Sequence, residues 1–478
     1  MDLNISERLG NLFGSWSHSA ADYIIPLPES GSYRRYFRIK GAGRQVIGAY
    51  NNDDRENNAF IYLGRHLRSK GNKVPEIYAT DLPNKVYLLE DLGDMTLHDN
   101  VISLKNEPGR DQKITDLYMK VIESMPGLQV NSSSGLDYSL CYPRAEFDAQ
   151  SILWDLHYFK YSLLKPLKTG FYEQDLEDDF QVIVKYLCKA KRDYFMFRDF
   201  QSRNIMLHNA GLYFIDFQGG RKGPLQYDLA SVLFEAKTSL DPAIREKLLE
   251  YYLETFSRSF KWFRTRSFLE YYYGFVYLRL MQAMGAYGFR GLTEHKPLFL
   301  QSLPGAVKIV TWLEKNHPLP LKLKCLPDVF SQLENNKGIP ELIPESAGLS
   351  VTIKSFSYKN GIPPDTSPDG GGFVFDCRSV NNPGRVEEFQ GLTGLDRPVI
   401  KFLDSQPDAT EFFKHTCILV DNAVNNYMSR KFTNLSVSYG CTGGRHRSVY
   451  MAERLAKFLK GKYKLKIVVN HTGIEAKG

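Results

Sequence analysis

Three polar residues near the middle of the chain have the types and spacing of a phosphoryl-transfer site. Asn204 follows Asp199 after five positions, and Asp216 comes directly after the apolar residues 213–215. A carboxylate can orient a hydroxyl nucleophile and accept its proton, while oxygen ligands hold the Mg²⁺ that bridges the phosphates of ATP. We therefore predict Asp199 as the catalytic base and Asn204 and Asp216 as magnesium ligands. The alternative is that the two aspartates end hairpin strands, because aspartate is common beside turns.

The surroundings of these residues favour the phosphoryl-transfer interpretation. Residues 205–207 and 213–217 are strand-like, and the turn-prone segment 208–211 joins them. The segment Gly-Pro-Leu-Gln-Tyr-Asp follows at 223–228. A base and a metal ligand placed on either side of such a strand-turn-strand unit are typical of kinase-like sites.

A second segment, near the C-terminus, has the pattern of an anion-binding loop. The strand-like residues 435–440 lead into the glycine-containing segment 441–448, and a helical pattern begins at Val449. Backbone N–H groups and a helix N-terminus bind phosphate, and Arg447 can hold two of its oxygens. The same residues form the C-x5-R-S signature of cysteine phosphatases with Cys441 as nucleophile, although Gly440 replaces the usual preceding His. A simple glycine turn is the third interpretation.

The elements that must position these residues differ along the chain. Residues 22–93 alternate short strands with one helical segment, 57–66, and the period becomes mainly helical from about residue 111. The proline-rich residues 318–344 are typical of a connection, and we expect a domain boundary near residue 345. Beyond it, strand-like and helical segments alternate, which predicts an α/β domain.

Length and composition bound the kind of protein. With 478 residues, 43% hydrophobic and 24% charged, the chain is expected to form at least two globular cores. Its apolar runs are far shorter than the roughly 20 residues of a membrane helix, and no secretory signal is visible. The six cysteines show no CxxC spacing, so we expect a reduced, cytoplasmic protein without membrane association.

The first constellation resembles the aminoglycoside phosphotransferase and choline kinase-like family, over roughly residues 10–325. The segments that carry the likeness are 32–38 (Ser-Tyr-Arg-Arg-Tyr-Phe-Arg), 87–93 (Tyr-Leu-Leu-Glu-Asp-Leu-Gly), the Asp199 loop and 215–218 (Ile-Asp-Phe-Gln). The resemblance implies an α+β bilobal protein-kinase-like fold, with an N-lobe at 1–93 and a C-lobe at 94–325. It is similar in particular to the AmgK-type kinases, which phosphorylate N-acetylmuramate or N-acetylglucosamine at C1 in cell-wall recycling.

This resemblance also implies the cofactors and the remaining roles. ATP and Mg²⁺ are the expected cofactors, and Asp228 would support the Asp199 loop. The residues assigned to ATP are Gly31, Ser32, Arg34, Arg35, Leu89, Glu90 and Asp91. A lysine is missing from strand 45–50, where kinases pair it with a helix glutamate, and Glu56 is the nearby helix acid. Arg34, Arg35 or Arg38 could supply the missing charge, or all three could be exposed, solvated arginines.

An aromatic helical segment is the candidate acceptor site. Residues 146–159 include Trp154 and Asp155, and sugars favour aromatic faces together with carboxylate hydrogen bonds. Asp155 is therefore a candidate sugar-binding residue. The alternative is that this aromatic stripe belongs to the core.

The second constellation resembles the C-terminal domain of the RNase adapter (RapZ) family, over nearly all of residues 350–475. Matching segments include Phe-Val-Phe-Asp-Cys-Arg at 373–378 and Leu-Thr-Gly-Leu-Asp at 392–396. In that family the domain binds glucosamine 6-phosphate and takes part in small-RNA recognition and oligomerisation. The resemblance implies a domain at 349–478, joined by a linker at 326–348. The implied ligand-loop residues are Thr442, Gly443, Gly444, His446, Arg447 and Ser448.

Charge supports a nucleic-acid partner without proving one. Residues 430–466 hold ten basic residues against the single acid Glu453, which suits phosphate neutralisation but equally a solvated helix face. The sequence thus predicts an ATP-dependent sugar phosphotransferase with an amino-sugar-phosphate sensing domain, with RNA and a homo-oligomer as further possible partners. The alternatives are a non-catalytic RNA- or protein-binding adapter and a Cys441-dependent phosphatase.

Overall fold

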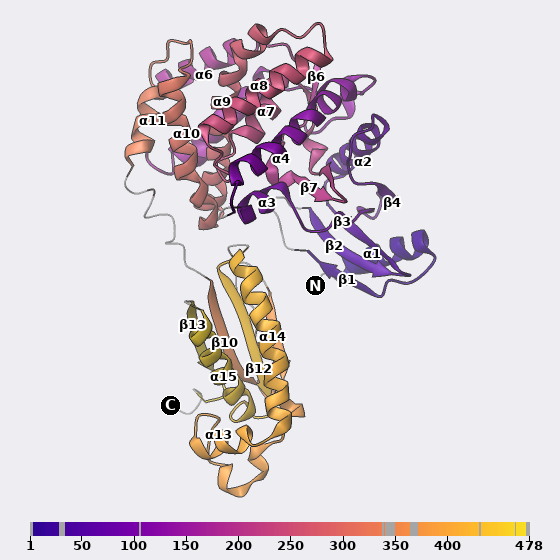
Figure 1. Cartoon of the computed structure of the whole chain (residues 1–478), viewed down its shortest axis with the longest axis vertical. Coiled ribbons are helices and arrows are strands. Elements are labelled where there is room, and N and C mark those ends of the chain that lie inside the picture. Colours follow the sequence, from indigo (N-terminus) through magenta and orange to yellow (C-terminus); the bar gives the residue numbers. More distant parts are fainter. Residues whose placement is uncertain are drawn as a thin grey trace. The chain divides into compact units, whose positions relative to one another are not determined.

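The computed structural model describes residues 3–27, 34–104, 107–336, 339, 349–363, 371–429, 432–463 and 465–474. The chain divides into two compact units, residues 1–344 and 345–478 (Figure 1). The predicted nucleotide-binding residues Gly31 and Ser32 lie outside the described residues.

The first unit begins with a five-stranded antiparallel sheet of order β1-β2-β3-β5-β4. Its elements are α1 (Leu3–Ser17), β1 (Tyr23–Pro26), β2 (Arg35–Gly41), β3 (Arg44–Tyr50), α2 (Asp54–Ser69), β4 (Ile77–Asp81) and β5 (Val86–Glu90). Side chains alternate along β5: Val86 and Leu88 pack in the cluster that contains the apolar face of α1, whereas Tyr87 and Leu89 pack in the cluster that contains α2. The two helices therefore cover opposite faces of the sheet.

Helix α2 starts at a well-formed N-cap, which fixes the position of its first turn. The Asp53 carboxylate accepts hydrogen bonds from the backbone N–H groups of Arg55 at 2.9 Å and Glu56 at 3.1 Å. Such caps satisfy donors that have no partner within the helix. Glu56 consequently has a defined place at the start of α2.

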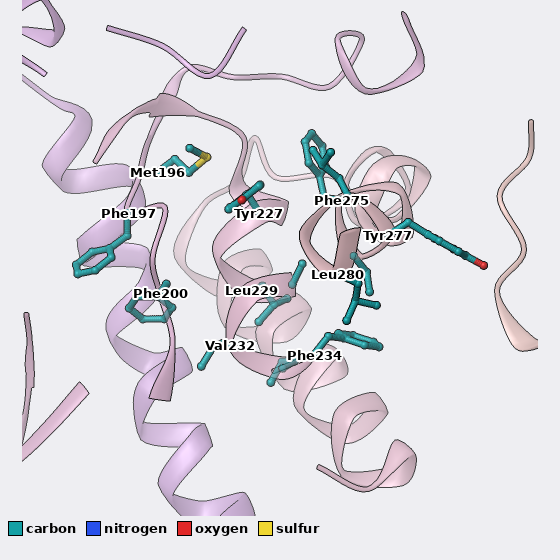
Figure 2. Close-up of a cluster of buried hydrophobic side chains, with 14 of the residues drawn as sticks. Met196, Phe197, Phe200, Tyr227, Leu229, Val232, Phe234, Phe275, Tyr277 and Leu280 are labelled. Carbon is teal, nitrogen blue, oxygen red and sulfur yellow. The ribbon is translucent and has the colours of Figure 1, made fainter. Parts of the chain in front are cut away.

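The rest of the first unit is mainly helical. Its helices are α3 (Leu97–Ser103), α4 (Arg110–Met125), α5 (Ala149–Phe159), α6 (Glu173–Leu187), α7 (Leu225–Leu233), α8 (Pro242–Ser259), α9 (Thr265–Gly288), α10 (Leu303–Asn316) and α11 (Leu326–Asn335). Every residue of α7 is buried, and Figure 2 shows its Leu229 and Val232 among aromatic side chains of neighbouring segments. None of the described helices is long and apolar enough to cross a membrane.

Two small antiparallel sheets of two strands each interrupt these helices. One pairs β6 (Tyr194–Met196) with β9 (Arg221–Gly223), and the other pairs β7 (Ile205–His208) with β8 (Gly211–Phe214). The β7–β8 turn has positive φ at Asn209 (47°) and Ala210 (57°), as a two-residue type I′ hairpin requires. The predicted strand-turn-strand unit is therefore present.

The second unit is a parallel four-stranded sheet of order β11-β12-β10-β13. Its elements are β10 (Ser350–Ser357), β11 (Gly372–Asp376), α13 (Arg397–Asp404), α14 (Pro407–Ser429), β12 (Asn434–Cys441), α15 (Arg447–Lys462) and β13 (Lys466–His471). Helices α14 and α15 contribute to the same apolar cluster as the strands. The segment between β12 and α15 is the predicted anion loop.

Candidate functional site

The loop that contains Asp199 is fixed by a buried carboxylate beneath it. Asp228 of α7 is fully buried and accepts hydrogen bonds from the backbone N–H groups of Phe197 at 2.9 Å and Arg198 at 3.0 Å. Burial raises the pKa of Asp228 to about 6. Arg198 adopts a left-handed backbone conformation, with φ of 79°. The predicted supporting role of Asp228 agrees with this geometry.

Asp199, Asn204 and Asp216 lie together, as their spacing predicted. Asn204 Nδ2 donates to the backbone carbonyl of Asp199 at 2.8 Å and lies 3.5 Å from Asp216 Oδ2. Gln218 Nε2 donates to Asp216 Oδ1 at 2.8 Å. A Cβ built on Gly219 would lie 3.7 Å from Asp199 Oδ2, so the segment after Asp216 passes close to the predicted base.

The donors at this site suit magnesium. Burial, and after it the charge of Asp199, raises the pKa of Asp216, whereas Gln218, Arg34 and Arg203 act in the opposite direction. Asn204 Nδ2 is the atom of this amide that is hydrogen-bonded to the Asp199 carbonyl, so Oδ1 is its candidate ligand atom. One or two carboxylates completed by substrate phosphates are the usual protein ligands of Mg²⁺. The described chain contains no cluster of three or more His, Cys, Asp or Glu residues that could hold a metal by themselves.

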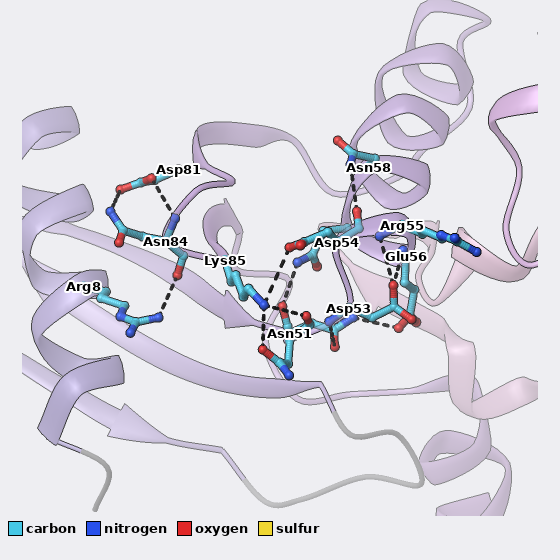
Figure 3. Close-up of polar contacts among 12 residues, drawn as sticks. Arg8, Asn51, Asp53, Asp54, Arg55, Glu56, Asn58, Asp81, Asn84 and Lys85 are labelled. Atoms are coloured by element: carbon cyan, nitrogen blue, oxygen red, sulfur yellow. Dashed lines mark hydrogen bonds and ion pairs between the residues drawn. The ribbon is translucent and has the colours of Figure 1, made fainter.

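Arg34 is a buried cation that pairs with the helix acid, as a lysine on β3 would in other kinases. It precedes β2, is 2% exposed, and its guanidinium lies 3.0 Å from the Glu56 carboxylate of α2. Asn51 Nδ2 holds the other Glu56 oxygen at 2.7 Å (Figure 3). Burial lowers the pKa of Arg34, but the nearby Tyr36, Tyr87 and Glu56 outweigh it and raise the pKa.

The charge of Arg34 also reaches the predicted metal site, because Arg34 counteracts the raised pKa of Asp216. The sequence left three arginines as candidates for the missing charge. Arg38 instead pairs with Asp91, its Nε lying 2.6 Å from the carboxylate, and the Arg35 guanidinium lies over the Phe37 ring. Arg34 is thus the arginine that pairs with the helix acid.

The predicted hinge residues belong to a well-connected segment. Leu89 is buried and pairs with Ile47 of β3, and a Glu90 oxygen accepts the backbone N–H of Glu76 at 3.1 Å. The Asp91 carboxylate accepts hydrogen bonds from Arg38, from Gln45 at 2.9 Å and from the Gly93 N–H at 2.9 Å. The side-chain oxygens of Glu90 and Asp91 therefore organise the hinge, and a direct contact of this segment with adenine remains a prediction.

Asp155 has a protein partner in the structure. It is 5% exposed, and its two oxygens accept hydrogen bonds from Arg198 at 2.7 and 2.6 Å. The Arg198 guanidinium lies over the rings of Phe147 and Tyr227 at 5.1 and 5.0 Å. Asp155 thereby fixes the residue that precedes Asp199, and its contact with a sugar stays a prediction. Trp154, by contrast, is 47% exposed.

The loop between β12 and α15 of the second unit exposes Thr442 and Gly443. Gly444 has φ of 69°, and a Cβ there would lie 2.9 Å from the Ser357 backbone nitrogen. Ser357 Oγ donates to the Thr442 carbonyl at 2.7 Å. Glycine is therefore required at 444 both for the left-handed backbone and for the close approach of β10.

The other predicted loop residues have partners within the protein. The Arg447 guanidinium donates to the backbone carbonyls of Arg378 at 3.0 Å and Val380 at 2.8 Å. A ring nitrogen of His446 lies 3.1 Å from the Phe389 carbonyl, and Ser448 Oγ lies 3.2 Å from Cys441 Sγ. A cysteine-phosphatase mechanism requires the arginine to face the bound phosphate, and this arrangement of Arg447 does not favour it.

Comparison with known proteins now identifies both units. Residues 24–268, just over half of the chain, match the phosphotransferase enzyme family. The chain belongs to this family. Residues 349–475 match the RapZ C-terminal domain. These matches confirm both resemblances and the fold class, a bilobal protein-kinase-like fold followed by an α/β domain.

Similar curated proteins are described as nucleotide-binding proteins. One from Glaesserella parasuis is 36% identical over 148 residues, which is 30% of this chain and 50% of that protein. One from Saccharophagus degradans is 38% identical over 133 residues, 28% of this chain and 44% of that protein. The phosphotransferase-family chain thus spans half or less of the length of these relatives.

Among solved structures, a streptomycin–ATP–aminoglycoside phosphotransferase ternary complex shares 14% identity at a TM-score of 0.44, covering 63% of this chain and 96% of that one. The Plasmodium vivax ethanolamine kinase shares 14% identity at a TM-score of 0.43, covering 61% and 83% respectively.

The sequence of this phosphotransferase-family protein did not reveal two features of the site. The first is which of three arginines pairs with Glu56. The sequence could not single out Arg34, because only the distance of each arginine from Glu56 distinguishes them. The sequence also did not indicate a role for Arg221. The sequence feature that could have drawn attention to Arg221 is the pair Gly219-Gly220, which stands between the Asp216 segment and Arg221.

Proposed function

We propose that the first unit transfers the γ-phosphoryl group of ATP to a hydroxyl of a sugar. The observation that supports this most strongly is the convergence of Asp199, Asn204 and Asp216, with Asn204 bonded to the Asp199 backbone at 2.8 Å and 3.5 Å from Asp216. Membership of the phosphotransferase family supports the same reaction class.

Each residue of the site has a distinct part in this reaction. Asp199 orients the acceptor hydroxyl and takes its proton as the oxygen attacks the γ-phosphorus. Asn204 Oδ1 and the Asp216 carboxylate would hold Mg²⁺, which when bound neutralises charge on the ATP phosphates. Arg34, held by Glu56, supplies positive charge to the phosphates in place of a lysine. Asp228 keeps the loop in register beneath Asp199.

The proposed nucleotide and acceptor sites rest on the resemblance to AmgK-type kinases in addition to the geometry. The hinge at Leu89, Glu90 and Asp91 would face adenine, and Gly31 and Ser32 would approach the phosphates. The acceptor is N-acetylmuramate or N-acetylglucosamine, phosphorylated at C1 in cytoplasmic cell-wall sugar recycling, as the resemblance to AmgK-type kinases implies. Asp155 would contact this sugar while it holds Arg198.

We propose that the second unit binds an amino-sugar phosphate at the loop between β12 and α15. Thr442 and Gly443 are exposed in the loop that leads into the 16-residue helix α15, and they would present backbone N–H groups to the anion. The domain would report the product of the pathway. RNA binding by the basic segment and homo-oligomer formation are further proposals drawn from the same resemblance.

The reaction is tested by incubating the protein with ATP, Mg²⁺ and N-acetylhexosamines and detecting sugar 1-phosphate by ³¹P NMR. Wild type should turn over, and Asp199→Ala should not, while binding ATP as before. A wild type that binds ATP but phosphorylates no sugar contradicts the proposal. In that case, salt-dependent RNA retention that survives Asp199→Ala would favour the non-catalytic adapter.

A further inference from the structure

Arg221 is a buried cation beside Asp199 that forms no ion pair among the residues the structure describes. It is 6% exposed and is the first residue of β9. In the β6–β9 pair it lies directly opposite Met196, and Met196 precedes Asp199 by three residues. Its Nε donates to the Gly219 carbonyl at 2.9 Å, while its two terminal nitrogens have no hydrogen-bond partner in the described part of the chain.

The two glycines before Arg221 allow the Gly219 carbonyl, which holds Arg221, to lie close to Asp199. A Cβ on Gly220 would lie 2.5 Å from the Phe195 ring and 2.9 Å from the Phe217 carbonyl, so no larger residue fits this turn. A Cβ on Gly219 would lie 3.7 Å from Asp199 Oδ2. The segment 219–221 therefore passes close to the Asp199 carboxylate, and its Gly219 carbonyl holds the Arg221 Nε.

The electrostatic surroundings leave the charge of Arg221 incompletely balanced. Burial and, less strongly, the neighbouring Arg198 lower the pKa of Arg221 to about 10, although Asp155 and Asp199 act in the opposite direction. Arg221 therefore stays positively charged at neutral pH. Because Asp155 already pairs with Arg198, it cannot balance both arginines. A buried cation without a counter-ion is costly unless a ligand supplies one.

We propose that Arg221 is a catalytic residue that contacts the phosphoryl group during its transfer. This inference rests on the proposed function, because it needs ATP as donor and Asp199 as base. The acceptor oxygen forms a bond to the γ-phosphorus, the bond from that phosphorus to the ADP oxygen breaks, and ADP leaves with the electron pair. The acceptor proton goes to Asp199. The terminal N–H groups of Arg221 donate to the non-bridging oxygens of the moving group, where its charge is concentrated.

The test compares Arg221→Gln and Arg221→Lys with the control Lys222→Gln, which removes one charge from the next residue of β9. Lys222 is a partly exposed residue paired with Asp193 at 3.4 Å. Arg221→Gln should lower kcat by about 10²–10³-fold with the KM values for ATP and sugar within about twofold. Arg221→Lys should recover part of kcat, and Lys222→Gln should match wild type. An unchanged ATP-induced thermal shift shows that each variant is folded.

A second readout separates this inference from the proposed function. Wild type should bind ADP with aluminium fluoride, which stands in for the moving phosphoryl group, more tightly than ADP alone, and Arg221→Gln should lose this gain. If wild type phosphorylates sugar and Arg221→Gln keeps its kcat, the role of Arg221 is wrong while the proposed function stands. A raised KM for an acidic sugar alone, with kcat unchanged, would assign Arg221 to the acceptor and overturn the proposal.

Discussion

Arg34, which is buried, forms an ion pair of 3.0 Å with the partly exposed Glu56, between the start of β2 and the first turn of α2. A protein kinase places a strand lysine and a helix glutamate in this relationship. Here the cation comes from the residue before the preceding strand. The pair is anchored on both sides, because Asn51 holds Glu56 and the Phe60 ring lies 4.9 Å from the Arg34 guanidinium.

Replacing Arg34 tests whether this pair serves the nucleotide. Arg34→Met should raise the KM for ATP and lower kcat, together by about 10²-fold or more in kcat/KM, because a charge on the phosphates is lost. It should also destabilise the fold by about 1–3 kcal/mol, since Glu56 loses its ion-pair partner but keeps the hydrogen bond from Asn51. Steady-state kinetics and urea denaturation measure the two effects. Arg35→Met, on the neighbouring arginine, is the control, and equal kinetic effects from both variants would refute the assignment to Arg34.

The metal site predicts a change in magnesium dependence. Asn204→Ala should raise the Mg²⁺ concentration for half-maximal activity by at least about tenfold, because one ligand oxygen is removed. Titrating MgCl₂ at saturating ATP measures this shift. Asn58→Ala removes an exposed amide from α2 and should leave the titration unchanged. An Asn204→Ala titration that overlays wild type would exclude Asn204 as a ligand.

The buried Asp228 predicts a pH dependence of stability. Its pKa is raised from the ordinary 3.8 to about 6 in the folded protein, so the folded state holds the proton more tightly than the unfolded chain. The resulting stabilisation is present below about pH 4 and is lost as the pH rises through about 6.

The free energy of unfolding of wild type should therefore fall by about 2–3 kcal/mol more than that of Asp228→Asn between these pH values. Urea denaturation across the range measures both proteins. Parallel curves for wild type and Asp228→Asn would show that Asp228 does not titrate in this window.

If the loop between β12 and α15 binds an anion, one negative charge introduced into it should weaken binding. Gly443 has open space around its Cα, so Gly443→Glu should fold normally while its carboxylate repels a bound phosphate. Affinity for glucosamine 6-phosphate, measured by calorimetry, should fall by at least about tenfold, or 1.4 kcal/mol. Gly461→Glu places the same charge at the other end of α15, also in open space, and should bind as wild type does. Equal affinities of wild type and both variants would show that the ligand does not bind at this loop.

The residues of the site differ in how far the sequence could predict them. Asp199, Asn204 and Asp216 were predictable because they lie within 18 positions on one hairpin unit, whose short turns fix their spacing. Arg34 and Glu56 come from different elements, and the residue pattern gives the face of a strand but not the distance to a helix. Asp155 was predicted as a candidate sugar-binding residue, with the core as the alternative. Its partner Arg198 is 43 positions away, and no local pattern reveals that pair.

The elements of the fold also differ in how far the sequence could predict them. Residues 57–66 predicted most of α2, because its apolar positions have a clear helical period. The residue pattern did not predict α1, β1 or β4. The strands β1 and β4 are short, partly exposed and lie at the two edges of the sheet. Their formation depends on pairing with β2 and β5, which only the three-dimensional structure shows.

The most direct test of phosphoryl transfer is a ³¹P NMR time course of ATP, Mg²⁺ and N-acetylmuramate with wild type and Asp199→Asn. Wild type should convert the γ-phosphate signal of ATP into a sugar 1-phosphate signal, with one ADP formed for each sugar phosphate. Asp199→Asn should bind ATP but form product at least about 10²-fold more slowly. Product formation at the wild-type rate by Asp199→Asn would contradict the assignment of Asp199 as the catalytic base.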